Sequence, residues 1–217
     1  MTTIVSQPSS TTDSAALVAD FGGSDSTAID YMIGVGLIKD SDAVFFQYQG
    51  DDAKQALMQP NGKPVTRLNN VVVTGVSVAD DVYENKSFKG VKLNLFVRTQ
   101  SGHNVMLTSG LTTLWSQCIV TALMGLYAEH GLNSLVNIDT WKGNSNMGTC
   151  FAAIRNNGRK VSSQAMYDDL YQARSNNRSE IDPLMRNAIA LLSAALNEDA
   201  VIDVPEAANA EIPGADF

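Results

Sequence analysis

The sequence has few of the residues with which proteins hold metals or build nucleophiles. Its 217 residues include two histidines and two cysteines. Cys118 lies within a helical pattern and Cys150 begins a predicted strand, so their separation matches neither a zinc-ligand spacing nor a disulfide framework. We interpret both as buried thiols, and His103 and His130 as surface or hydrogen-bonded side chains. The sequence therefore predicts no metal site and no cofactor.

Motifs for nucleotide binding and hydrolysis are also missing. The sequence has no G-x-x-x-x-G-K-[ST] phosphate loop and no G-x-S-x-G nucleophile elbow, and residues 34–36 lack the third glycine of a dinucleotide fingerprint. The carboxylate pairs at 80–81 and 168–169 are adjacent in sequence. Adjacent acids are typical of solvated or capping positions. We therefore predict that the protein is not an enzyme.

Long apolar segments are absent as well. The sequence has no run of about 18 apolar residues that could span a membrane. Its N-terminus lacks the basic start and apolar stretch of a signal peptide. We therefore expect no membrane association and a cytoplasmic location, which for a viral protein would be the host cytoplasm.

Basic residues are scarce overall but concentrated in the middle of the chain. The formal net charge is −8. Between Lys63 and Ser162 there are ten Lys or Arg and five Asp or Glu, a balance of +5 that leaves −13 for the rest. This asymmetry indicates a basic working surface with acidic appendages.

The basic central segment has a regular pattern of strands around one helix. Predicted strands cover 71–78, 91–99, 103–107, 135–141 and 149–155, and a predicted helix covers 112–129. Residues 79–81 are predicted to form a loop. Apolar residues spaced by three and four mark one face of the helix, and Thr112 or Thr113 is predicted to cap its start. The order β-β-β-α-β-β is that of the OB-fold, a five-stranded, partly open barrel. We predict a mainly β fold with helices (α+β), built on an OB-fold-like barrel.

The flanking segments divide the chain further. We predict a flexible N-terminal segment (1–27), an accessory strand and helix layer (28–62), an OB-like nucleic-acid-binding core (63–162), C-terminal helices (163–196) and a disordered acidic tail (197–217). In the accessory layer, 43–48 predicts a strand and 53–58 a short helix. Whether residues 28–58 pair within one chain or between chains stays open.

The barrel segment also contains the parts of a single-strand binding site, namely cations and exposed aromatic rings. Phe96 shares a predicted strand face with Lys92 and Arg98, opposite a Leu and Val face. OB-folds commonly bind ligands with the loops between their first two and their last two strands, and here both predicted loops contain aromatic residues and lysines. The candidate nucleic-acid-binding residues are Tyr83, Lys86, Phe88, Lys89, Lys92, Phe96, Arg98, Trp141, Lys142, Arg155, Arg159 and Lys160.

A structural interpretation is also open for Phe96, Trp141 and the segment around Arg159. Phe96 could pack under the N-terminal layer, and Trp141 could belong to the core. The sequence RNNGRK around Arg159 could be a solvated hairpin tip. Trp115, within the predicted helix, is interpreted as a core residue because large apolar side chains are usually buried.

The C-terminal stretch 197–217 has six acids, no Lys or Arg, and ends in Phe. With the central strand pattern, this tail resembles those of single-stranded DNA-binding proteins from bacteria and their phages. The resemblance implies that the tail docks onto replication, recombination and repair proteins and competes with DNA for the basic groove. The matching residues, and hence the predicted partner-binding residues, are Ile212, Pro213, Asp216 and Phe217, although two residues separate Ile-Pro from Asp-Phe.

We therefore predict a protein that coats and protects single-stranded DNA during replication or recombination, with a homo-oligomer as one option for its assembly. Because stacking and phosphate contacts do not read the sugar, RNA stays an alternative ligand. A structural or assembly protein of a virus or bacterial particle is the main alternative. The acidic balance, the Ser/Thr-rich N-terminus and the glycine-interrupted apolar stretch around Met32 favour it. An enzyme subunit or accessory factor without chemistry of its own is a third.

Overall fold

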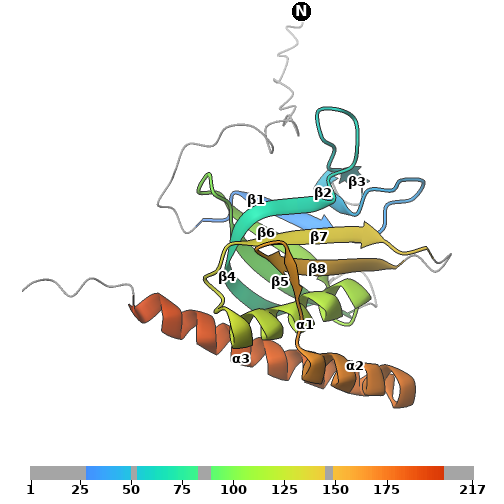
Figure 1. Ribbon diagram of the computed structural model, residues 1–217. Coiled ribbons are helices and arrows are strands. Elements are labelled where there is room, and N and C mark those ends of the chain that lie inside the picture. The colour runs from blue at the N-terminus through green and yellow to red at the C-terminus, as the bar shows by residue number, and fades with distance from the viewer. Residues whose placement is uncertain (1–27, 50–52, 83–88, 145–148, 203–217) are drawn as a thin grey trace, which may run out of the picture.

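The computed structural model describes residues 28–49, 53–82, 89–144 and 149–202 (Figure 1). The described chain has a mixed α+β fold with a nine-stranded sheet and three α-helices. The elements are β1 Tyr31–Val35, β2 Phe45–Gln49, β3 Ala53–Ala56, β4 Arg67–Val82, β5 Lys89–Arg98, β6 Asn104–Gly110, α1 Leu114–Glu129, β7 Val136–Lys142, β8 Cys150–Asn156, β9 Arg159–Val161, α2 Gln164–Asn176 and α3 Ile181–Ile202. The strand order is β3-β2-β1-β6-β5-β4-β7-β8-β9.

The predicted order of three strands, one helix and two strands is confirmed by β4, β5, β6, α1, β7 and β8. The predicted loop at 79–81 is wrong, because β4 continues through these residues. Ala79 pairs with Lys92 and Asp80 with Val91 on β5. Aspartate has a low strand propensity, but the ladder to β5 outweighs that preference here.

Strand β4 is the bent centre of the sheet. Its first residues, 67–71, pair with β7, whereas 72–82 pair with β5. The register shifts in both ladders, and Asn70 has a positive φ of 51°. Such irregularities bend a strand and increase its twist, and Figure 1 shows β4 as a strongly curved ribbon. In the described chain the sheet ends at β3 and β9 and does not close on itself.

The segment predicted as an accessory layer instead extends the same sheet. Strand β1 pairs in parallel with β6, and β2 and β3 follow in antiparallel order. Residues 31–35 thus pair within this chain. The predicted helix at 53–58 is wrong, because four residues from Ala53 pair with β2. So short a helix gains too few hydrogen bonds to offset its nucleation cost, whereas the edge of β2 offers partners at once.

The core lies between the sheet and α1. Trp115, Ile119, Leu123 and Leu126 of α1 are buried, and α1 packs mainly on β8 while α3 packs on β4 and α1. The predicted cap is confirmed at Thr113, whose side chain accepts a hydrogen bond from the Ser116 amide. In Figure 1 the three helices lie together below the strands. None of the described helices is long and apolar enough to cross a membrane.

The C-terminal helices extend beyond their predicted bounds. The predicted C-terminal helices are α2, which Ser163 caps, and α3, which begins at Ile181. It then continues to Ile202, so the first residues assigned to the acidic tail are helical. The rest of that tail, including the predicted partner-binding residues, lies outside the described residues.

Candidate nucleic-acid interface

The two sides of the β7–β8 strand pair carry different residues. Val136, Ile138 and Thr140 are buried on the side of α1. The alternate residues Asn137, Asp139 and Trp141 pair with Arg155, Ala153 and Phe151 across the ladder. Directly paired residues of antiparallel strands project from the same side. These six residues therefore form one surface, which we call the β7–β8 face.

One end of the β7–β8 face is aromatic. The ring centroids of Trp141 and Phe151 are 6.1 Å apart and their planes differ by 20°. Trp141 is 43% exposed. Gly143 makes room for the pair, because a Cβ atom there would lie 2.7 Å from the Phe151 ring. The pair therefore offers an open aromatic surface held in place by the local backbone.

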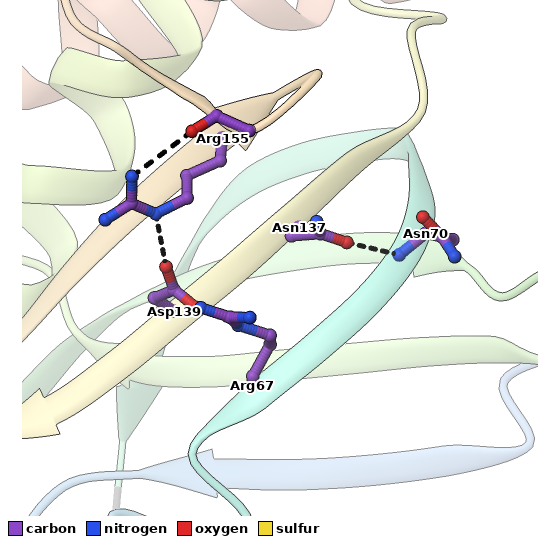
Figure 2. A network of polar contacts seen from close by, with 6 residues as sticks. Arg67, Asn70, Asn137, Asp139 and Arg155 are labelled. Atoms are coloured by element: carbon purple, nitrogen blue, oxygen red, sulfur yellow. Dashed lines mark hydrogen bonds and ion pairs between the residues drawn. The ribbon is translucent and has the colours of Figure 1, made fainter.

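The middle of the face is a shared ion pair (Figure 2). The Asp139 carboxylate accepts hydrogen bonds from Nε of Arg67 and, at 2.7 Å, from Nε of Arg155. Burial acts to raise the pKa of Asp139, but the hydrogen bonds and charges of the two arginines outweigh it, and the pKa is lowered. Two guanidinium groups on one carboxylate leave a net positive charge. Each guanidinium carries five N–H donors, so donors remain for a phosphate.

Lys142 follows Trp141 on β7 and, because side chains alternate along a strand, projects from the side opposite the aromatic pair. Its Nζ lies 3.3 Å from the Ser41 carbonyl oxygen and 3.6 Å from a carboxylate oxygen of Asp42. Asp42 is almost fully exposed, and exposed ion pairs contribute about 0–1 kcal/mol. The ammonium group can therefore leave Asp42 for a phosphate at little cost.

The far end of the face lies at the edge of the sheet. The predicted turn is present at Asn157 and Gly158, which have φ values of 48° and 78°. Arg159 and Lys160 follow it on β9, both exposed, and Lys160 pairs with Arg155. Four residues separate Phe151 from Arg155, which corresponds to about 13 Å along a strand.

The candidates on β5 lie on a different part of the sheet. Leu93, Leu95 and Val97 are fully buried, so the predicted two-faced pattern of this strand is confirmed. Phe96 is half-buried, and its ring lies beside Gly75, where a Cβ atom would approach it to 3.1 Å. The curved strand β4 separates β5 from β7. Lys92, Phe96 and Arg98 therefore do not share a flat surface with Trp141.

The remaining predicted site residues are Arg98 on β5 and those of the predicted loop and tail. Nε of Arg98 donates a hydrogen bond of 3.2 Å to Asn104 Oδ1. Tyr83, Lys86 and Phe88 lie outside the described residues, as do Ile212, Pro213, Asp216 and Phe217. Lys89 begins β5, but its side chain is among those not described.

Sequence reasoning did not assign Phe151 and Asp139 of the β7–β8 face as site residues, nor Arg67 of β4, which donates a hydrogen bond to Asp139. Phe151 lies one strand away from Trp141, and Arg67 is 72 residues from Asp139. The alternation of residues along a strand predicts which of them share a side. To predict which residues meet across two strands, one must also know the register of their ladder.

A cavity of about 390 Å³ lies where the start of β8 meets the ends of β1 and β6. Val35, Ser109 and Cys150 are among its lining residues, together with Trp115 of α1. Burial raises the pKa of the Cys150 thiol, against the opposing charges of Lys142 and Lys54. Cys150 is therefore a neutral, buried thiol, as the sequence predicts, whereas Cys118 on α1 is only partly buried. Trp115 is a core residue whose Nε1 donates to Thr140 Oγ1 at 3.1 Å.

Comparison with known proteins gives no match. A scan of family models and searches of curated proteins and of solved structures find nothing similar to this chain.

Proposed function

We propose that this protein binds single-stranded nucleic acid, DNA in the first place, on its β7–β8 face. The observation that carries the proposal is the exposed Trp141 ring, stacked with Phe151 and followed along the same face by arginines. Every nucleobase has a flat face that can stack on an aromatic ring, and every nucleotide brings a phosphate for a cation. The face thus matches the two features that all single strands share.

The strand order supports this proposal. The five strands β6-β5-β4-β7-β8 are neighbours in this order in the sheet. Helix α1 connects β6, the third of these strands in sequence, to β7, the fourth. This is the arrangement of an OB-fold in which the last contact of the barrel is not made. OB-folds bind oligonucleotides with a sheet surface and flanking loops. We propose that the sheet is an open OB-like barrel extended by β1, β2 and β3.

The biological role that we propose is protection of single strands during replication, recombination or repair in the cytoplasm. The acidic C-terminal residues would recruit other proteins of these processes and weaken DNA binding by competing for the same cations. Salt would weaken binding too, because phosphate contacts release counterions. No chemical step is part of this role.

Tryptophan fluorescence during titration with oligo-dT tests the proposal. Trp141 is exposed and Trp115 is buried. Stacking of a base would therefore quench the fluorescence of Trp141 and leave that of Trp115 as an internal reference. We expect tight binding at low salt, with quenching that Trp141→Phe abolishes while fluorescence anisotropy still reports binding. Trp141→Ala should weaken binding, and Tyr127→Ala, an exposed aromatic on α1, is the matched control.

Absence of binding at low salt would contradict the proposal. Light scattering would then test the alternative of a structural protein, for which we would expect large assemblies that form without nucleic acid.

A further inference from the structure

Helix α2 presents a second stacked pair of exposed aromatic rings. Tyr167 and Tyr171 are 47% and 52% exposed. Their centroids lie 6.3 Å apart with planes 20° from parallel, which closely matches the geometry of Trp141 and Phe151. The buried side of α2 consists of other residues, Met166, Leu170 and Ala173. Core packing therefore does not account for the two tyrosines.

Strand β9 connects this tyrosine pair to the β7–β8 face. Lys160 lies directly opposite Arg155 in the β8–β9 ladder. Lys160 also borders a cavity of about 100 Å³ together with Tyr167 and Arg174 of α2. The Arg174 guanidinium donates a 2.9 Å hydrogen bond to Gln117 Oε1 on α1. Cations thus lie between the two aromatic pairs, one of them anchored to the helical layer.

The junction between β9 and α2 is tightly packed. The Ser163 amide donates to the Thr121 carbonyl oxygen at 2.9 Å, and the Ser163 side chain caps α2. A Cβ atom at Gly125 would lie 2.5 Å from the Ser162 backbone, so α1 approaches this junction as closely as glycine allows. The position of α2 relative to the sheet is therefore set before any ligand binds, which reduces the entropy cost of binding.

Two acids on α2 limit how a polyanion can approach. Asp169 lies two residues from each tyrosine, and such residues do not face each other on a helix. Asp168 is three residues before Tyr171, a spacing that places two residues on the same face of a helix, and its carboxylate accepts a 2.8 Å hydrogen bond from Gln164. Two cations, Arg174 and Lys160, lie around the cavity that Tyr167 borders. A strand that approaches from β9 therefore meets positive charge first.

We infer that a bound single strand continues from the β7–β8 face across β9 onto α2, where Tyr167 and Tyr171 stack further bases. This inference rests on the proposed function and extends it to longer strands. It assigns Lys160 and Arg174 to the phosphates between the two stacking sites.

Strand length provides the test. Anisotropy titrations of the full chain would use dye-labelled oligo-dT of about 6 and about 20 nucleotides, which span the usual range of site sizes. For the double variant Tyr167→Ala/Tyr171→Ala we expect about tenfold weaker binding of the long strand, from the loss of stacking, and unchanged binding of the short one. Tyr127→Ala is the control for removal of an exposed tyrosine and should bind both strands normally.

A second variant tests the path independently of the rings. Lys160→Gln should weaken binding of the long strand more than that of the short one and lower its salt dependence by about one phosphate contact. Equal losses for both lengths, or no loss for the long strand, would overturn the inference.

Trp141→Ala separates the inference from the proposed function. If this variant weakens binding of both lengths while the tyrosine variant binds like wild type, only the inference fails. If the wild-type protein binds neither strand, the proposed function and the inference both fail.

Discussion

The two sides of strand β7 differ in nearly every physical property, although they alternate residue by residue. On the inner side Thr140 is buried and accepts a hydrogen bond from Trp115. On the outer side the next residue, Trp141, is largely exposed and stacks on Phe151. The two tryptophans thus lie on opposite sides of one strand. If the outer side binds a strand as we propose, stability and ligand binding belong to opposite sides of β7, and substitutions should separate them.

Truncation of the inner tryptophan should have the largest effect. Trp115 is 1% exposed, and Trp115→Ala removes its core contacts and leaves Thr140 without its donor. We expect the free energy of unfolding to fall by about 3–5 kcal/mol, as measured by urea denaturation. Trp141→Ala is the matched substitution on the outer side and should cost about 1 kcal/mol, the loss of one aromatic pair. Similar losses for the two variants would contradict the separation of the faces.

Truncation of the outer tryptophan should instead affect binding. Stacking of a base on an aromatic ring contributes about 1–3 kcal/mol, so Trp141→Ala should weaken oligo-dT binding by about 5- to 150-fold. Anisotropy titration at fixed salt measures this change. A normal affinity in a folded Trp141→Ala protein would show that the strand does not use this face.

Protonation of Asp139 tests how much the ion pair in the middle of the β7–β8 face stabilises the fold. The pKa of Asp139 is lowered in the folded protein, so its unfolded state binds a proton more readily. The stability from this carboxylate is therefore present above its unfolded pKa, about 3.9, and is lost as pH falls through the lower folded pKa. Urea denaturation of wild type and Asp139→Asn between about pH 7 and about pH 3 measures it.

We expect wild type to exceed Asp139→Asn in stability at neutral pH, with a difference that shrinks under acid. Asp42→Asn is the control, because Asp42 is nearly fully exposed and should show little difference at any pH. A gap between wild type and Asp139→Asn that stays constant down to low pH would mean that the ion pair with the two arginines does not stabilise the fold.

Displacement of the Phe151 ring should have the smallest effect. A methyl group in Gly143→Ala would meet this ring at 2.7 Å and turn it away from Trp141. We expect a few-fold loss of oligo-dT affinity and a loss of stability of about 1 kcal/mol. Gly36→Ala, where the nearest ring atom is 3.7 Å from the added carbon, is the control. Equal affinities of the two variants would show that the ring position is unimportant.

Local sequence patterns were enough to predict the order of the main strands and the helix of the central segment, although not the full length of β4 or the short strand β9. The alternation in β5 specified its buried Leu and Val residues, and the spacing of apolar residues specified α1 with its cap at Thr113. These features depend on neighbours within a few residues, where side-chain periodicity and hydrogen bonding to the local backbone act directly. The order of three strands, a helix and two strands could be read for the same reason.

Only the tertiary structure decided how these elements meet. Strand β3 exists because β2 offers it an edge, and β4 continues through aspartates because β5 pairs with them. The stacking of Trp141 on Phe151 and the bridging of Arg67 and Arg155 by Asp139 depend on ladder register. A shift by one residue would turn each of these side chains to the other side of the sheet. Register is set by the packing of the whole core, which no local pattern of residues encodes.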